Sequence, residues 1–228
     1  MIFYLKIREH FPKKNKFKEY CIMMKKFGLF STLAAVCLLF VGCGEAKQVD
    51  ASVIADLQAA YNGEMNAAAK YELYAAKAAE KGYASVAALF RATHRAESLH
   101  AARHSKVLKS LGVEPKAEIV LPKYVNVETS LRDGIKGETY EMTTMYPDFI
   151  ANAKSKNAPA EVIETLTFAL EAEKEHAKLY TEAVNAMEKW KKPGKTFYVC
   201  SVCGYTTDKP LAACILCAAP GDKFEVFK

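Results

Sequence analysis

Four long stretches of the chain repeat apolar residues every three or four positions, which is the spacing of one face of an α-helix. Glycines follow the first two stretches, at Gly82 and Gly112, where helices commonly end. The pattern therefore predicts four long helices. They cover residues 50–81, 85–111, 129–156 and 159–190.

The segments between these helices differ in length, and this difference sets the topology. The two outer connections are short, whereas the middle one, residues 113–127, has two prolines and no helical period. Short loops place consecutive helices side by side, so we expect an all-α up-down bundle over residues 49–191 with one long crossover, as in ferritin-like folds. Pro147 falls inside the third helix and should bend or loosen it, because proline lacks the backbone N–H. Residues 196–228 are short and punctuated by glycine and proline, which predicts a separate small module.

The net charge of +6 comes from the start of the chain. Residues 1–42 hold eight lysines and arginines and two acids, so the remainder has 24 basic and 24 acidic residues and is neutral. A basic patch that could bind nucleic acid is therefore not expected in the remainder, and we predict no nucleic-acid partner.

The first 42 residues have the layout of an export signal. Two lysines follow Met24, an uncharged apolar run extends over residues 27–42, and Cys43 comes next. Cys43 after Gly42 resembles a bacterial lipobox, which implies lipidation at Cys43 and an exported protein anchored to a membrane, periplasmic or on the outer cell surface. An uncleaved N-terminal anchor is the alternative, although the apolar run is slightly short for a span of about 20 residues. Met24 is a candidate start of translation, and Met1 is the alternative.

Two Glu-x-x-His pairs lie in the second and fourth predicted helices. "RAESLHAARH" holds Glu97 and His100, and "EAEKEHAKLY" holds Glu173 and His176. Residues three apart share one face of a helix, so each carboxylate projects together with its imidazole. The two pairs can therefore face each other inside the bundle.

The first and third helices each add a carboxylate, at Glu64 in "NGEMNAA" and Glu138 in "KGETYEM". Several buried carboxylates need positive charge beside them, and two divalent metal ions supply it. Mixed oxygen and imidazole ligands suit iron or manganese, and one Glu from each of two helices with Glu-x-x-His from the other two is the general template of di-iron carboxylate bundles. The alternative is that these residues belong to solvated helix faces. His94 and His104 have no carboxylate at matching spacing and are expected to be polar or exposed.

Four cysteines cluster near the end of the chain as CxxC, ten residues, CxxC. They are Cys200, Cys203, Cys214 and Cys217. Four thiolates in two such pairs make a tetrahedral site suited to Zn or Fe. Two disulfides are the alternative, since exported proteins form them.

The stretches "LFRATHRAESLHAARH", "GETYEMTTMYPDF" and "EAEKEHAKLY", together with "VCSVCGY" and "CILCAAPGDKFE", resemble the rubrerythrin family over residues 50–228. The resemblance implies a ferritin-like di-iron bundle followed by a rubredoxin-like module. The implied cofactors are two Fe in the bundle and one Fe in the four-cysteine site.

The resemblance also implies a role for each ligand of the bundle site. Glu97 and Glu173 would bridge the two irons. Glu64 would be terminal on one iron, and Glu138 with His176 on the other.

Three further residues receive roles from the resemblance alone. Glu141 fills the place of an extra family carboxylate one turn after the third-helix glutamate and would exchange with His100 as an iron ligand when the redox state changes. Tyr71 and Tyr146 match family tyrosines that donate hydrogen bonds near the site.

The function that the resemblance implies is reduction of hydrogen peroxide to water in oxidative-stress protection, a peroxidase activity of the rubrerythrin type. Electrons would come from an unidentified donor through the four-cysteine iron, and we expect a homodimer. Two alternatives remain open: a ferritin-like ferroxidase or iron-binding protein, and a lipid-anchored scaffold with a structural Zn in its tail.

Overall fold

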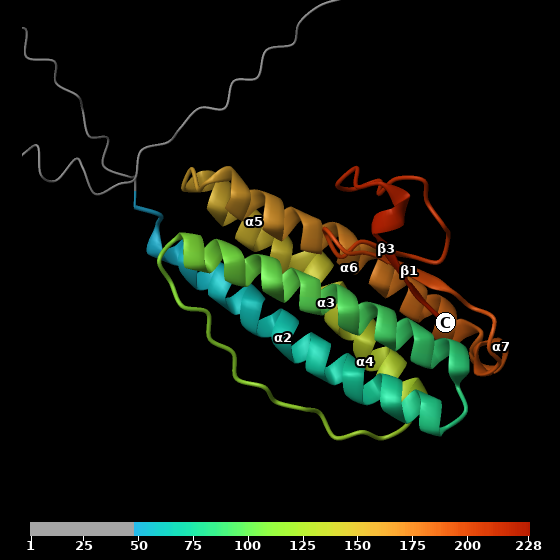
Figure 1. Cartoon of the computed structure of the whole chain (residues 1–228). Helices are drawn as coiled ribbons and strands as arrows, with labels where there is room; N and C mark the ends of the chain where they lie inside the picture. Colours follow the sequence, from blue (N-terminus) through green and yellow to red (C-terminus); the bar gives the residue numbers. More distant parts are fainter. Residues whose placement is uncertain (1–47) are drawn as a thin grey trace, which may run out of the picture. The chain divides into compact units, whose positions relative to one another are not determined.

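The computed structural model describes residues 48–228, so the predicted export signal and the predicted lipidation site at Cys43 lie outside the described residues. Long helices dominate the described part of the chain, and a small sheet follows them (Figure 1). The helices are α2 (Ala51–Glu80), α3 (Ala84–Ser110), α4 (Val127–Tyr140), the π-helix η1 (Glu141–Met145), α5 (Tyr146–Ser155), α6 (Ala160–Asn185), α7 (Met187–Lys191) and the 3-10 turn η2 (Gly221–Lys223). The strands are β1 (Phe197–Cys200), β2 (Thr206–Thr207) and β3 (Phe224–Phe227).

The predicted four-helix bundle is confirmed. α2 and α3 pack as one hairpin, and the continuous helix α4–η1–α5 packs with α6 as the second. Asp50 begins α2 by accepting a hydrogen bond from the backbone N–H of Ser52 at 2.9 Å. Gly82 and Gly112, with φ of +77° and +79°, follow the ends of α2 and α3 in the left-handed conformation that glycine adopts most readily. None of the helices within residues 48–228 has the length and apolar content that a membrane crossing needs.

The prediction that Pro147 loosens the third helix is also confirmed. Pro147 lies at the start of α5 and has no N–H for the carbonyl of Thr143. The turn just before it is a π-helix, and Glu141 is its first residue. Single π turns inside α-helices are frequent at functional sites.

The long connector, residues 113–126, has no regular secondary structure and runs along the outside of α2 (Figure 1). Polar side chains one helical turn apart hold its backbone: Gln58, Asn62 and Asn66 each form hydrogen bonds with it. Asn66 both donates to the connector backbone and accepts from it, at 2.8 Å in each case. The crossover is therefore fixed by α2 although it has no helix or strand of its own.

The apolar core has two clusters inside the bundle, and charged residues are buried among the same helices. One cluster includes Tyr71, Phe90, Leu131 and Tyr180, and the other includes Leu57, Leu108, Ile150, Val162 and Leu166. Burying one large apolar side chain contributes roughly 1.5–3 kcal/mol, so the two clusters offset the cost of enclosing carboxylates in the same bundle.

The tail forms a three-stranded antiparallel sheet in the order β2-β1-β3, which packs against α3. Arg95 of α3 holds it through a bidentate ion pair with Glu225, with its closest N···O distance at 2.7 Å. The fourth helix was predicted to continue to residue 190, but α6 ends at Asn185. The break at Ala186 turns α7 so that Trp190 is buried with its ring 5.8 Å from that of Phe197.

Candidate metal centre

Six carboxylate and imidazole side chains meet inside the bundle, one or two from each of its four long helices. Each is at most 1% exposed. They are Glu64 of α2, Glu97 and His100 of α3, Glu138 of α4, and Glu173 and His176 of α6. The helices bring together the residues that the spacing singled out, so the alternative of solvated helix faces is wrong.

These side chains form two groups of four that share two members. Glu97 and Glu173 belong to both groups, Glu64 and His100 complete one, and Glu138 and His176 complete the other. In each group, one ligand atom per residue lies within 4.8 Å of all the others. Two shared carboxylates between two metal positions are the arrangement of a two-metal site.

Both imidazoles point Nδ1 into the cluster. His100 Nδ1 lies 3.1 Å from Glu97 and 3.3 Å from Glu173. His176 Nδ1 lies 2.7 Å from Glu173 and 3.2 Å from Glu97. The rings are therefore oriented to bind through Nδ1, and their Nε2 atoms face outward.

The cluster fits divalent metals because its polar atoms lack other partners. Among residues 48–228, six buried side-chain nitrogen or oxygen atoms have no hydrogen-bond partner, and five belong to this cluster. Four of them are oxygens of Glu64, Glu97, Glu138 and Glu173. A buried acceptor without a partner costs about 1–3 kcal/mol, so these oxygens are arranged for cations.

The electrostatics of the metal-free cluster lead to the same conclusion. Burial and the neighbouring Glu97 raise the pKa of Glu173 well above its ordinary value. Burial alone would lower the pKa of His176, but the carboxylates of Glu97 and Glu173 raise it well above its ordinary value. Against the effect of burial, His100 lowers the pKa of Glu64, and His176 lowers that of Glu138. The carboxylates thus compete for the positive charge inside the cluster, and divalent metal ions would supply it.

Glu141, Tyr71 and Tyr146 lie around this cluster. Glu141 begins the π-helix one turn after Glu138 and belongs to neither group of four. Tyr71 donates a hydrogen bond to Glu138, and Tyr146 donates one to Glu64. Each tyrosine thus orients a carboxylate from the opposite hairpin.

His104 was expected to be polar or exposed, and the structure shows that it is polar and buried. It is fully buried, with Nε2 at 3.2 Å from the hydroxyl of Tyr146 and Nδ1 at 3.1 Å from the hydroxyl of Thr165. His94 is part-buried and pairs with the backbone carbonyl of Ala68 at 2.9 Å. The sequence signal for His104 was its place four residues after His100, on the same helix face.

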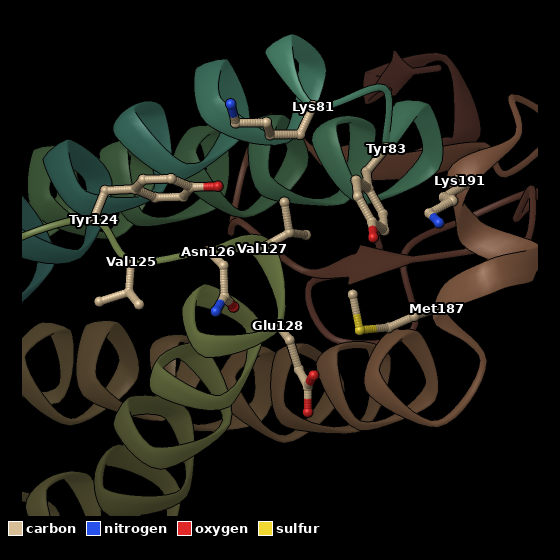
Figure 2. Close-up of a pocket in the computed structure, with 9 residues that line it drawn as sticks. All are labelled: Lys81, Tyr83, Tyr124, Val125, Asn126, Val127, Glu128, Met187 and Lys191. Carbon is tan, nitrogen blue, oxygen red and sulfur yellow. The ribbon is translucent and has the colours of Figure 1, made fainter.

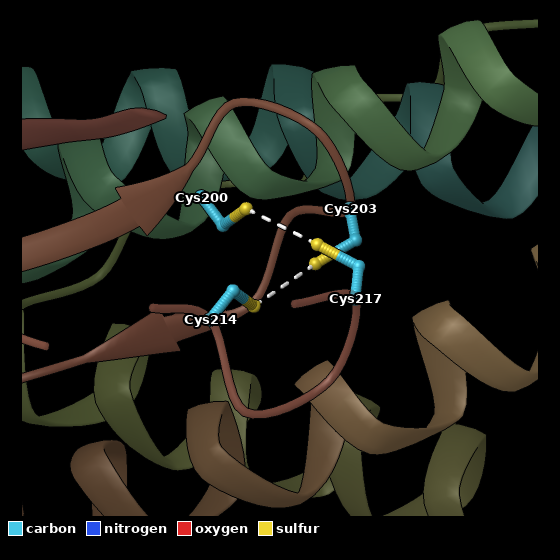
Figure 3. A group of neighbouring side chains, drawn as sticks. All are labelled: Cys200, Cys203, Cys214 and Cys217. Carbon is cyan, nitrogen blue, oxygen red and sulfur yellow. Dashed lines mark hydrogen bonds between the residues drawn. The ribbon is translucent and has the colours of Figure 1, made fainter. Parts of the chain in front are cut away.

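The four cysteines form the second cluster (Figure 3). Cys200 and Cys217 have their sulfurs 3.6 Å apart, and so do Cys203 and Cys214. A disulfide needs about 2.05 Å, whereas sulfurs bound tetrahedrally at about 2.3 Å from a metal lie about 3.8 Å apart. The geometry fits a metal site and not two disulfides.

Cys200 is the thiol of this cluster that ionises most readily, because its hydrogen bond raises the pKa of Cys203 and burial raises the pKa of Cys217. A hydrogen bond from Cys203, opposed by burial, lowers the pKa of Cys200 to about 5. The thiolate is the form that binds metals.

The two clusters adjoin each other through residues 204–206. His176 Nε2 is 3.0 Å from the hydroxyl of Thr206, and the ring of His100 lies against Gly204, where an added Cβ would be 2.7 Å from Cδ2. Gly204 follows the cluster ligand Cys203 directly. One short segment of the tail thus contacts the outward nitrogens of both imidazoles. Sequence patterns carry no signal for this contact.

A separate pocket of about 470 Å³ lies where the connector meets α4 (Figure 2). Tyr83 and Tyr124 line it, with Lys191 Nζ 5.1 Å from the ring centre of Tyr83. None of the carboxylates of the bundle cluster lines this pocket.

Comparisons with known proteins agree with this geometry. The family model described as rubrerythrin matches residues 56–184. Rubrerythrin-2 of Clostridium acetobutylicum is 34% identical over 175 residues, covering 75% of this chain and 94% of the relative. Nigerythrin of Nitratidesulfovibrio vulgaris is 32% identical over 186 residues, covering 80% of this chain and 90% of the relative.

Solved structures are similar as well. Fully reduced, all-ferrous nigerythrin superposes with a TM-score of 0.72 at 29% identity, covering 88% of this chain and 100% of the other. Bacterioferritin BfrA of Mycobacterium tuberculosis, at 20% identity and a TM-score of 0.57, shares the ferritin-like fold. The predicted fold class is therefore confirmed. The chain belongs to the rubrerythrin family, which has a di-iron centre in its bundle and a rubredoxin-like iron site, and it carries the carboxylate–histidine cluster and the four-cysteine cluster that hold them.

Proposed function

We propose that this protein is a peroxidase that reduces hydrogen peroxide to water and so protects against oxidative stress. The observation that carries the proposal is the contact of residues 204–206 with both His100 and His176. This contact joins the four-cysteine cluster, which with iron bound would receive electrons one at a time, to the carboxylate–histidine cluster, which with two irons bound would deliver two electrons. Membership of the rubrerythrin family supports the proposal.

The reaction consumes one peroxide, two electrons and two protons and yields two waters. Two irons bound in the cluster would supply both electrons and act as Lewis acids on the peroxide oxygens. The residues of the chain then have to hold the metals, admit electrons and deliver protons.

We propose the ligand roles that the resemblance to the rubrerythrin family implies. Glu97 and Glu173 are the shared members of the two groups and would bridge the metals. Glu64 with His100, and Glu138 with His176, would complete the two positions. The tyrosine hydroxyls fix the two terminal carboxylates, since each donates to one of them.

The same resemblance makes Glu141 a candidate ligand that binds iron in one redox state and not in the other. It lies outside the four-residue groups but one turn from Glu138, in a π turn, which is an element frequent at functional sites. We propose that it replaces His100 when the metals are oxidised.

Electrons would enter through the four-cysteine site. Iron is the metal that this role requires, because zinc has no redox chemistry. The path from Cys203 to the bundle then runs through Gly204 to the His100 ring, and the Thr206 hydroxyl contacts His176.

Two alternatives make different predictions. A ferroxidase needs no electron port, so the contact at residues 204–206 favours the peroxidase. A scaffold with zinc in its tail has no use for five unpaired polar atoms in its bundle.

Metal analysis with a visible spectrum tests the proposal. Protein lacking residues 1–43 is purified without oxygen, reduced, and treated with one equivalent of peroxide. We expect about three irons per chain, a red oxidised four-cysteine site, and stoichiometric oxidation of the reduced centres. One zinc per chain with no iron in the bundle would refute the peroxidase.

We also propose that the protein is exported, lipidated at Cys43 and anchored to a membrane, and that it forms a homodimer. The lipobox-like sequence around Cys43 supports the anchor. Its electron donor must then be membrane-bound or outside the cytoplasm. Intact mass of the membrane-extracted protein should show a diacylglyceryl addition that is lost in Cys43→Ala, and light scattering should give twice the chain mass. An unprocessed N-terminus would instead support an uncleaved anchor.

A further inference from the structure

A line of buried polar groups connects the bundle cluster with a surface depression. The depression has a volume of about 170 Å³, and Thr165 lines it together with Glu161 and Glu164. Thr165 is only 2% exposed, so it forms the inner end of the depression. From there the groups follow one another in the order Thr165, His104, Tyr146 and Glu64.

The hydrogen bonds in this line have one consistent direction. The hydroxyl of Tyr146 donates its only hydrogen to Glu64, so its oxygen is the acceptor for His104 Nε2. Nε2 therefore carries a hydrogen, and Nδ1 of the neutral ring accepts from the hydroxyl of Thr165 at 3.1 Å. Burial lowers the pKa of His104, which agrees with a neutral ring.

We propose that this line, from Thr165 through His104 and Tyr146 to Glu64, is the route by which protons from solvent reach the bundle cluster. The inference rests on the proposed function, because peroxide reduction consumes two protons for every two electrons. When each hydrogen moves one bond inward, water in the depression gives a proton to Thr165 and Glu64 receives one. The ring then carries its hydrogen on Nδ1. Rotation of the imidazole and of the two hydroxyl groups, without return of the proton from Glu64, puts a hydrogen again on the nitrogen that faces Tyr146, so each cycle delivers one proton.

The other tyrosine of the site has no such connection. Tyr71 donates to Glu138, and its ring packs 5.4 Å from that of Tyr180. The hydroxyl of Tyr180 pairs with Thr93, which in turn bonds to backbone carbonyls of its own helix. Within residues 48–228, the hydrogen bonds of this second line end at the backbone of α3, whereas those of the first line end at Thr165 beside the depression.

The mouth of the depression suits proton uptake. Carboxylates of Glu161 and Glu164 lie at its rim with Arg103 and Lys106. The Arg103–Glu164 ion pair measures 3.4 Å, and Glu161 accepts from Ser110 at 3.0 Å. Carboxylates at a solvent-exposed rim collect protons and pass them to water.

A direct test follows hydrogen exchange at His104 Nε2 by nuclear magnetic resonance in the full-length protein loaded with Zn(II), which is diamagnetic. Thr165→Val keeps the shape of the side chain and removes the hydroxyl. We expect exchange of the Nε2 hydrogen with water to slow about tenfold or more in Thr165→Val. The matched control is Thr167→Val on the same helix, whose hydroxyl bonds to its own helix at Ile163 O, 2.7 Å away, and it should exchange like the wild type. Equal exchange in wild type and Thr165→Val would overturn the proposal.

A second test uses the iron-loaded protein in a single oxidation by peroxide. His104→Gln keeps polar atoms for both neighbours but cannot pass a hydrogen across a ring, and Thr165→Val breaks the entry. Both should oxidise roughly 10- to 100-fold more slowly, since positioned proton transfer contributes at least that much. Added imidazole should restore part of the rate in His104→Gly, and His94→Gln, on the same helix but paired with Ala68, should match the wild type.

The two proposals fail in different ways. If the wild type is not oxidised by peroxide, the peroxidase proposal fails, while the exchange measurement in the zinc form still decides the route. If the wild type is oxidised and both His104→Gln and Thr165→Val keep its rate, the route is wrong and the peroxidase stands.

Discussion

Substituting Gly204 with alanine tests the contact between the two clusters. Gly204 has φ of +82°, and an added Cβ would be 2.7 Å from His100 Cδ2, where ordinary contact begins at 3.4 Å. The His100 ring is 1% exposed and its Nδ1 contacts Glu97 at 3.1 Å, so moving the ring away from residue 204 would disturb the bundle cluster. The turn around Gly204 therefore has to retreat by about 0.7 Å or more.

The cost has two parts that a control separates. Alanine in the left-handed region costs about 1–2 kcal/mol, and forcing a methyl into a packed contact costs about 1–3 kcal/mol more. Gly82→Ala is the matched control, because Gly82 has φ of +77° and nothing within 4 Å of an added Cβ. The free energy of unfolding measured in urea should therefore be about 1–3 kcal/mol lower for Gly204→Ala than for Gly82→Ala.

The same variant should slow electron transfer. After the four-cysteine iron is reduced first, its reoxidation by the bundle site, followed by stopped-flow absorbance, should be slower in Gly204→Ala and unchanged in Gly82→Ala. Equal stability and equal transfer rates in the two variants would show that residue 204 does not contact His100 in solution, and the reasoning would be refuted.

Three further predictions follow from individual sites. Removing the metals with a chelator should lower the unfolding temperature measured by calorimetry. A ligand present at 1,000 times its Kd stabilises the folded protein by about 4 kcal/mol, and removal of the ligand loses this contribution. No shift in the unfolding temperature would mean that the bundle cluster binds no metal. Cys203→Ser should abolish the red absorption band of the four-cysteine iron site, yet elemental analysis should still find two irons per bundle. Loss of all iron would show that the bundle cluster does not bind metal independently of the four-cysteine site. Burial raises the pKa of Tyr180 well above its ordinary value, so the unfolded chain ionises first above about pH 10 and stability falls as pH rises. Urea unfolding at pH 9–11 should show a free energy of unfolding that falls faster with pH in wild type than in Tyr180→Phe. The difference in slope should approach about 1.4 kcal/mol per pH unit above pH 10, and equal slopes would exclude this cause.

The sequence was sufficient for the bundle and its ligands because the signals are local. Residues three apart in a helix share one face, so the spacing alone requires Glu97 and His100 to project in the same direction. Loop lengths then decided which helices are neighbours. The end of α6 was missed because no glycine or proline marks Ala186; the break is set by burial of Trp190 against Phe197, which is a tertiary effect.

The hydrogen-bond partners of His104 were missed for a related reason. Its partners were sought on its own helix, whereas Tyr146 and Thr165 come from the second hairpin. Residue spacing relates positions on one helix only. It therefore gives no indication of a histidine whose hydrogen-bond partners lie on other helices of the bundle. The contact between Gly204 and His100 was not predicted for the same reason. Neither the sequence around Gly204 nor that around His100 has a pattern that indicates packing of the tail against the bundle.

The two connections to the bundle cluster are separate, and this has a consequence for how they can fail. The tail reaches the cluster through the outward nitrogens of the imidazoles, at Gly204 and Thr206. The line from the depression reaches it at Glu64, on a carboxylate. If electrons use the first connection and protons the second, Thr165→Val should leave reduction of the bundle by the tail unchanged, and Gly204→Ala should leave exchange at His104 unchanged. A variant that slowed both would mean that the two connections share a group, and Glu64 is the place to look because His100 Nδ1 lies 3.6 Å from it.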